Sequence, residues 1–396
     1  IINNTLVSFT PNKIELKAFD AKTGDSNLNV KGSLDNFYGF LFKKQELKGD
    51  FKLNSSLLKV SDFMTTSIDS KETSTPTTNT SVKIPAFLNC SFTANATKVI
   101  YDNLTLSNVS GSMVIQNEAV KLKDLKMGLF GGNIGMNGTV STKEKTPVFN
   151  MDLGLKGLNI SDSFSQIEML SSIAPIANAI EGKFNSTIKL SGNLTENMTP
   201  NINSISGDLL GQLVNSKVTV KNSKILTSLS SEMKFLDLKK LNLNDVKAVF
   251  SFKDGKVNVK PFNLKYKDIK VKVNGVHGFD QQMQYNLKFD IPTKYLGSDV
   301  ANYISKLSPK DAQKIKEIPV TAGLSGNFSN PKITTDLNQA TTNLTNQLIA
   351  QQKNSLINKG KSTLTKLLNG KKDSTKTKKV TNILNGLFGK KKKKKN

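Results

Sequence analysis

Apolar and polar residues alternate with a period of two along most of the first 340 residues. The pattern is clear in Lys256–Lys260 and Lys270–Asn274, where valines occupy every second position. It recurs in Ile14–Lys17, Val120–Lys123 and Asn286–Asp290. Such alternation is typical of half-buried strands with one wet face, and the short polar segments between these runs favour hairpins. The sequence therefore predicts a mainly β fold: an elongated, twisted antiparallel sheet.

The alternation also repeats at long range. Residues 104–140 align without a gap to residues 241–277, and residues 14–32 form a third, shorter copy. The equivalent positions include Leu16, Leu122 and Val259, each followed sixteen residues later by a glycine: Gly32, Gly138 and Gly275. We interpret these copies as a solenoid-like or meander array in which each unit extends the same sheet.

A few helices should interrupt the strands. Apolar residues at every third position predict a helix over 162–180 that Pro175 breaks, and a weaker signal covers 223–234. Two short helices are expected around 298–317, the second beginning at Ser308 as N-cap with a proline at the first helical position. Leucines from Leu337 to Leu368 predict a terminal amphipathic helix or pair of helices.

These helices are too few to cover the apolar face of so long a sheet. That face either closes against a second sheet, as in a sandwich, or stays open as a groove that requires an apolar ligand. Acyl chains suit such a groove, because each buried methylene contributes roughly 0.8 kcal/mol. We predict the open groove, lined in its repeats by Val120, Leu122, Met127, Val257, Val259, Leu264, Val271 and Val273.

The net charge of +25 is concentrated near the end of the chain. Residues 341–396 contain 15 lysines and one acidic residue, Asp373, and the chain has no arginine. Without guanidinium groups, sequence-specific nucleic-acid binding is not expected. The final lysines suit an anionic membrane surface, although a solvated charge run and nonspecific nucleic-acid binding are alternatives. We predict membrane contact through Lys390, Lys391, Lys392, Lys393, Lys394 and Lys395.

Nothing in the sequence indicates catalysis. The chain has one histidine, His277, and one cysteine, Cys90, so an intrachain disulfide is impossible. Both residues lie in strand-like runs, where structural roles are expected. The segment Phe130–Asn133 suits a tight turn rather than a phosphate loop, because no helix follows it. We therefore predict a non-enzymatic protein with no catalytic residue, metal site or cofactor.

Several short motifs, in order, resemble the C-terminal region of the AsmA family. Residues 129–138 read LFGGNIGMNG, a Gly-Gly turn leading into a strand that ends in a polar residue and glycine. Residues 155–160, 181–184, 190–194 and 205–209 follow in the AsmA-like order, and residues 324–333 add a late match. The resemblance covers roughly residues 14–335.

The resemblance implies a protein of the Gram-negative periplasm that acts in outer-membrane lipid homeostasis, related to bridge-like lipid-transfer proteins with a repeating β-groove. It implies phospholipid or another envelope lipid as ligand, and an inner-membrane anchor that would lie before Ile1, since no apolar run here reaches 18 residues. An assembly factor for outer-membrane proteins and a cell-surface adhesin are the alternative functions.

The expected parts are a β repeat unit at 1–64, a flexible Ser/Thr-rich insertion at 65–82, the AsmA-like β-groove at 83–335, an amphipathic helical segment at 336–370 and a Lys-rich tail at 371–396.

Overall fold

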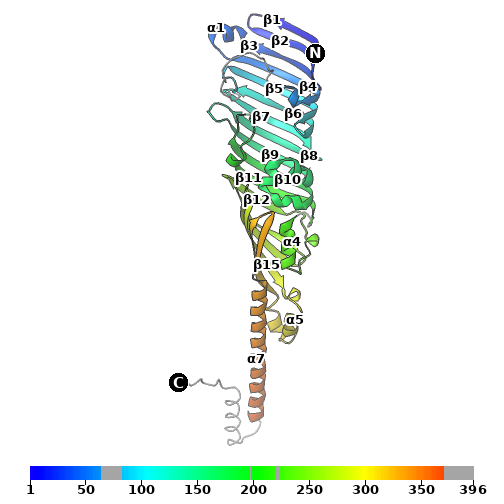
Figure 1. The fold of residues 1–396 in the computed structure, drawn as a ribbon, viewed down its shortest axis with the longest axis vertical. Coiled ribbons are helices and arrows are strands. Elements are labelled where there is room, and N and C mark those ends of the chain that lie inside the picture. The colour runs from blue at the N-terminus through cyan, green and yellow to red at the C-terminus, as the bar shows by residue number, and fades with distance from the viewer. Residues whose placement is uncertain (64–82, 197, 220–222, 370–396) are drawn as a thin grey trace. The chain divides into compact units, whose positions relative to one another are not determined.

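The structure is a computed structural model that describes residues 1–63, 83–196, 198–219 and 223–369 (Figure 1). The expected insertion at 65–82 lies outside the described residues. The protein is mainly β, with 55% of the described residues in strands, and these strands form one open sheet of seventeen. The mainly β prediction is therefore confirmed.

Strands β1 to β15 follow one another across the sheet in chain order, and the colours of Figure 1 show this succession from β1 to β12. The strands of this part are β1 (Ile2–Phe9), β2 (Lys13–Thr23), β3 (Ser26–Asp35), β4 (Leu47–Lys59), β5 (Leu88–Tyr101), β6 (Leu104–Gln116), β7 (Ala119–Leu129), β8 (Gly132–Ser141), β9 (Val148–Asn159), β10 (Ile180–Asn193), β11 (Ser206–Val218), β12 (Lys247–Lys253), β13 (Lys256–Tyr266), β14 (Ile269–Gly278) and β15 (Gln282–Pro292). The last two strands, β16 (Glu317–Asn327) and β17 (Asn330–Thr335), pair with each other.

One strand pair departs from the antiparallel prediction. β4 and β5 run parallel, with Leu47 opposite Leu88 and Lys59 opposite Ile100. A parallel neighbour requires the chain to cross from one end of the sheet to the other. The antiparallel prediction is wrong at this pair, because period-two alternation gives no information on strand direction.

The three sequence repeats fall on three equivalent hairpins, β2–β3, β7–β8 and β13–β14. In each, the pairing register shifts directly after the equivalent apolar residue: Leu16, Leu122 and Val259. The residue opposite each of them is the repeated glycine, Gly32, Gly138 or Gly275. The repeat is therefore a hairpin with a β-bulge beside a glycine, which increases the local twist of the sheet.

Helices occupy a few of the connections. They are α1 (Phe37–Lys43), α2 (Ile160–Gln166), α3 (Glu168–Ile173), α4 (Lys224–Glu232), α5 (Ser298–Ser305), α6 (Pro309–Ala312) and α7 (Leu337–Asn369), with short 3-10 segments that include η1 (Val60–Phe63), η2 (Pro175–Ala179) and η5 (Leu238–Lys240). The helix expected over 162–180 is divided into α2, α3 and η2. The predicted start of α6 is confirmed, since the Ser308 hydroxyl accepts a hydrogen bond from the Asp311 amide at 3.2 Å. The terminal leucine pattern forms one helix, and α1 was not predicted.

The described chain separates into two compact units. The first comprises residues 1–290 and 321–335, which carry most of the sheet. The second comprises residues 291–320 and 336–396, of which 370–396 lie outside the described part. Within the second unit, α5 packs against α7, where Leu344 and Leu348 are buried and the Gln352 side chain donates to the Tyr303 carbonyl at 2.8 Å. None of the helices in the described part of the chain has the length and apolarity that a membrane span requires.

Candidate functional site

One face of the sheet carries an unbroken row of mostly apolar positions from β2 to β15. Each member pairs directly with the next across the strands, so all of their side chains point to the same side. The row consists of Leu16, Gly32, Phe51, Phe92, Met113, Leu122, Gly138, Met151, Leu190, Gly207, Phe252, Val257, His277 and Met283. Neighbouring rows of paired residues run alongside it. We call the surface of the sheet that carries these rows the apolar face. The prediction of a stripe that continues from unit to unit is confirmed.

The apolar face is open over β2 to β8, which we call the open half. Of the apolar side chains described before residue 148, only four are buried: Cys90, Ala96, Val99 and Leu129. The row members Leu16, Phe51 and Leu122 are half-buried, although they lie in the middle of their strands. The candidates Val120 and Met127 are also half-buried on this face. Side chains this apolar keep a partly exposed surface because no described helix packs over the middle of these strands.

A depression of about 290 Å³ marks one part of the open half. Its lining is entirely apolar and comes from β3, β4, η1 and β5: Leu28, Val30, Phe51, Leu53, Leu58, Phe63 and Phe92. The rings of Phe51 and Phe92 stack at its floor with centroids 5.3 Å apart. A hollow with no polar group in its wall can bind a hydrocarbon chain but offers nothing to a polar ligand.

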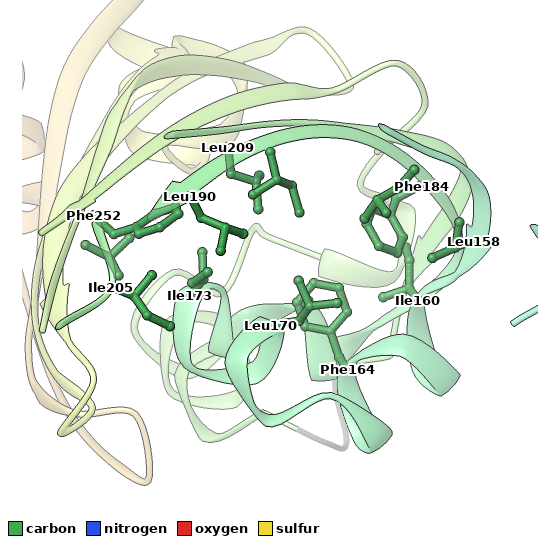
Figure 2. Close-up of a cluster of buried hydrophobic side chains, with 14 of the residues drawn as sticks. Leu158, Ile160, Phe164, Leu170, Ile173, Phe184, Leu190, Ile205, Leu209 and Phe252 are labelled. Atoms are coloured by element: carbon green, nitrogen blue, oxygen red, sulfur yellow. The ribbon is translucent and has the colours of Figure 1, made fainter. Parts of the chain in front are cut away.

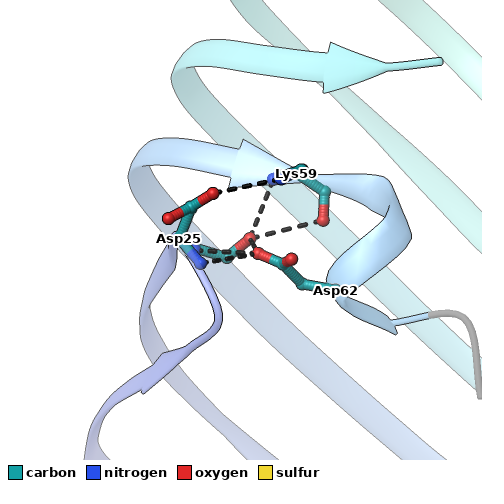
Figure 3. A network of polar contacts seen from close by, with 4 residues as sticks. Asp25, Lys59 and Asp62 are labelled. Atoms are coloured by element: carbon teal, nitrogen blue, oxygen red, sulfur yellow. Dashed lines mark hydrogen bonds and ion pairs between the residues drawn. The ribbon is translucent and has the colours of Figure 1, made fainter.

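A polar network fixes the wall of this depression (Figure 3). One carboxylate oxygen of Asp62 accepts hydrogen bonds from the amides of Asp25 and Ser26, both at 3.0 Å, and from the Ser26 hydroxyl at 2.7 Å. Lys59 forms an ion pair with Asp25 at 3.1 Å. The Ser26 hydrogen bonds lower the pKa of Asp62. Asp62 thereby anchors η1 to the β2–β3 turn and holds the adjacent Phe63 at the depression.

The same face is covered over β9 to β14, which we call the covered half. The connection between β9 and β10 forms α2, α3 and η2, and these pack on the sheet (Figure 2). Figure 2 shows Phe164, Leu170 and Ile173 directed at the sheet side chains. The rings of Phe164 and Phe184 lie 5.7 Å apart, and Ile173 is fully buried.

A second segment, between β11 and β12, covers the strands that follow. It contains α4 and η5, and its side chains Ile225, Leu229 and Met233 are buried. The Tyr266 hydroxyl, on β13, donates to the Phe235 carbonyl at 3.2 Å and accepts from the Asp237 amide at 3.0 Å. Tyr266 is fully buried, so the segment lies against the apolar face here.

Because these segments cover the sheet, part of the predicted groove lining is wrong. Val257, Val259, Val271 and Val273 retain exposed fractions of 0%, 2%, 4% and 9%. They are core residues of the covered half and do not line an open groove. Leu264 is half-buried. Of the predicted lining, Val120, Leu122 and Met127 remain on an accessible surface, and the inference that helices were too few to cover the face was wrong for this half.

His277 joins the cover to the sheet. Its Nδ1 lies 2.9 Å from the Tyr285 hydroxyl, and its Nε2 lies 3.3 Å from the carbonyl of Ser172 at the end of α3. Burial lowers the pKa of His277, which favours the neutral ring. The Phe328 ring packs edge-on against it at 5.4 Å. The expected structural role of His277 fits these contacts.

The other candidate reactive groups show no arrangement for chemistry. Cys90 is buried in β5, and burial raises the pKa of its thiol, which keeps it protonated and unreactive. The described residues include no group of three or more His, Cys, Asp or Glu side chains placed to hold a metal ion. The lysines at 390–395 lie outside the described residues, so their predicted membrane contact stays a prediction.

Comparisons with protein-family models, curated proteins and solved structures found no match for this chain. The resemblance to the AsmA family therefore stays a prediction.

Proposed function

We propose that this chain binds lipid on the open half of the apolar face, as an AsmA-like protein of the bacterial envelope that supports outer-membrane lipid homeostasis. The observation that carries the proposal is the continuous apolar row from Leu16 to Leu122 with no described helix above it. An uncovered apolar surface of this length is unfavourable in water unless it has a ligand. Acyl chains supply that ligand without any need for hydrogen-bonding groups.

The form of the open half suits a chain-like ligand. The row runs across the strands, and the Phe51 and Met151 side chains pack directly over the facing glycines Gly32 and Gly138. Contact with about ten methylenes would contribute roughly 8 kcal/mol at 0.8 kcal/mol each. Polar and lysine side chains alternate with the apolar ones along these strands and point to the opposite, wet side of the sheet.

A single pair of variants tests the proposal. Leu122→Glu places a charge in the middle of the open half, where water can still reach it, so the protein is expected to fold and to lose bound lipid. Lys121→Glu is the matched control, because it introduces the same side chain one residue earlier on the wet side. Native mass spectrometry of the purified proteins measures bound phospholipid. Lipid-free wild-type protein contradicts the proposal and favours the assembly-factor alternative. Lipid retained by Leu122→Glu contradicts binding on the open half.

The Lys-rich tail supports a second part of the proposal, contact with an anionic membrane surface. Each lysine near such a surface contributes about 1 kcal/mol, and the contribution falls with added salt. Flotation with anionic vesicles, with and without residues 371–396, measures it. Salt-sensitive loss of flotation on truncation is the expected result, and unchanged flotation contradicts it.

A further inference from the structure

The helix α1 presents large apolar side chains to solvent. Tyr38, Leu41 and Phe42 have exposed fractions of 46%, 53% and 70%, all within one helix of seven residues. Singly exposed apolar residues are ordinary, but a contiguous group of this size marks a contact surface.

The backbone of α1 is held firmly, so the exposure does not reflect a loose segment. Asn36 and Lys44 flank the helix in left-handed conformations, and the Asn36 side chain donates to the Glu46 carbonyl at 3.0 Å. Gly39 is buried, and a Cβ atom there would meet the side-chain ends of Asn36 and Gln45, which pack closely over it. The Phe40 ring packs on Phe87 with centroids 5.0 Å apart, which anchors the inner side of the helix.

Neighbouring elements enlarge the exposed surface at the same ends of the strands. The Asn12 carbonyl, in the β1–β2 turn, accepts a hydrogen bond from the Phe37 amide at 3.3 Å. Phe9, which ends β1 just before that turn, and Phe87, which precedes β5, are both exposed. We call Phe9, Tyr38, Leu41, Phe42 and Phe87 the α1 patch.

Positive charge borders the patch. Lys43 and Lys44 end the helix, and in the described part of the chain no carboxylate forms an ion pair with either. The Lys43 ammonium lies 5.7 Å from the centre of the Tyr38 ring. The acidic residues nearest in sequence have other partners: Asp35 forms an ion pair with Lys13, and Glu46 accepts a hydrogen bond from the Asn89 side chain.

We propose that the α1 patch inserts into the surface of an anionic lipid bilayer. Aromatic rings and a tyrosine hydroxyl suit the boundary between headgroups and acyl chains, and lysines beside them attract anionic headgroups. Lysine stems can also lie along apolar surface while their ammonium groups stay in water. This contact is separate from the lysine tail and does not depend on lipid binding by the open half.

The chain contains no tryptophan, so one introduced tryptophan reports on its own surroundings. Phe42→Trp places the reporter in the patch. Tyr101→Trp is the control, since Tyr101 is also exposed but ends β5 at the strand end away from Phe87. Each full-length variant is mixed with phosphatidylglycerol–phosphatidylcholine vesicles whose acyl chains carry bromine, which quenches nearby tryptophan. We expect a blue shift and quenching for Phe42→Trp and neither for Tyr101→Trp.

Several outcomes would overturn the proposal. Vesicle binding without any change in Phe42→Trp emission assigns the contact to the tail. Equal quenching at both positions indicates nonspecific adsorption, and a vesicle-independent blue shift that grows with protein concentration indicates a second copy as the partner. Phe42→Glu should weaken vesicle binding about ten-fold or more, because burying a phenylalanine contributes about 1.5–3 kcal/mol and 1.4 kcal/mol is ten-fold. Co-purified lipid should be unchanged in Phe42→Glu, which separates this test from that of the open half.

Discussion

The open and covered halves are built from the same kind of strand. The apolar face is partly accessible in the open half, whereas helices bury it in the covered half. Leu122 and Val259 are equivalent repeat positions, each beside a bulge and opposite a glycine. Leu122 is half-buried, whereas Val259 retains 2% of its surface. The difference lies in the connections: those between β5 and β9 are short, whereas the β9–β10 and β11–β12 connections carry helices that fold over the sheet.

The comparison shows how one repeat can serve as a binding surface or as a core. A strand row supplies an apolar face, and this face becomes a core where the helices of an adjoining connection pack over it, as those between β9 and β10 do. The covered half then contains a protein core on this face, and the open half carries the candidate ligand site. Variants at equivalent positions of the two halves should therefore respond differently, and three measurements test this.

The largest expected difference comes from placing a carboxylate in the shared row. Val257→Glu buries a charge in the core of the covered half, which should lower the free energy of unfolding by about 4 kcal/mol or more. Leu122→Glu, in the same row of the open half, should cost about 1 kcal/mol because its carboxylate reaches water. Urea unfolding followed by circular dichroism gives both values. Equal losses would show that the two halves do not differ in cover.

Aromatic truncation should give a smaller contrast. Phe164 packs on Phe184 within the covered half, and Phe164→Ala should cost about 3–5 kcal/mol through the cavity it leaves. Phe92 stacks on Phe51 in the open half, and Phe92→Ala should cost about 1–2 kcal/mol, because its ring is already partly exposed. The denaturation midpoints of the two variants give the comparison. A greater loss for Phe92→Ala would mean that the open half is a closed core.

The alternation of apolar and polar residues was sufficient to predict the sheet, its repeats and the side chains that share a face. Leu16, Leu122 and Val259 were placed correctly because a period of two fixes which side a residue faces. The cover was not predictable in the same way. The helical spacing of Phe164, Leu170 and Ile173 indicated a helix. The spacing contains no information on which strands that helix packs against.

Two further features were missed for related reasons. The parallel pairing of β4 and β5 depends on the path of the chain between them, which the alternation of either strand does not contain. The sequence FYGFLFK of α1 has no polar face and so gave no amphipathic signal, although its run of aromatic residues was visible. An apolar run without the alternation of apolar and polar residues seen in the strands is the signal that could have indicated an exposed contact surface.

The smallest expected contrast is in the response to acid. The covered half contains His277, whose pKa is lowered by burial from its ordinary value of 6.5. The folded protein therefore binds this proton less readily than the unfolded chain, and stability should begin to fall as the pH drops below 6.5. The open half contains Asp62, whose pKa is lowered from 3.8 chiefly by the Ser26 hydroxyl. Its contribution is present above pH 3.8 and is lost as the pH falls toward its lower folded value.

The two groups thus predict losses in separate pH windows, each removable by one substitution. His277→Gln should flatten the dependence of unfolding free energy on pH between 6.5 and 5, and leave the acid limb unchanged. Asp62→Asn should flatten only the limb below pH 4, with a small effect because the carboxylate is exposed to solvent and screened. Urea titrations at closely spaced pH values measure both slopes. If Asp62→Asn alters the dependence near neutrality, or His277→Gln alters none of it, the assignment of these groups to the two halves is wrong.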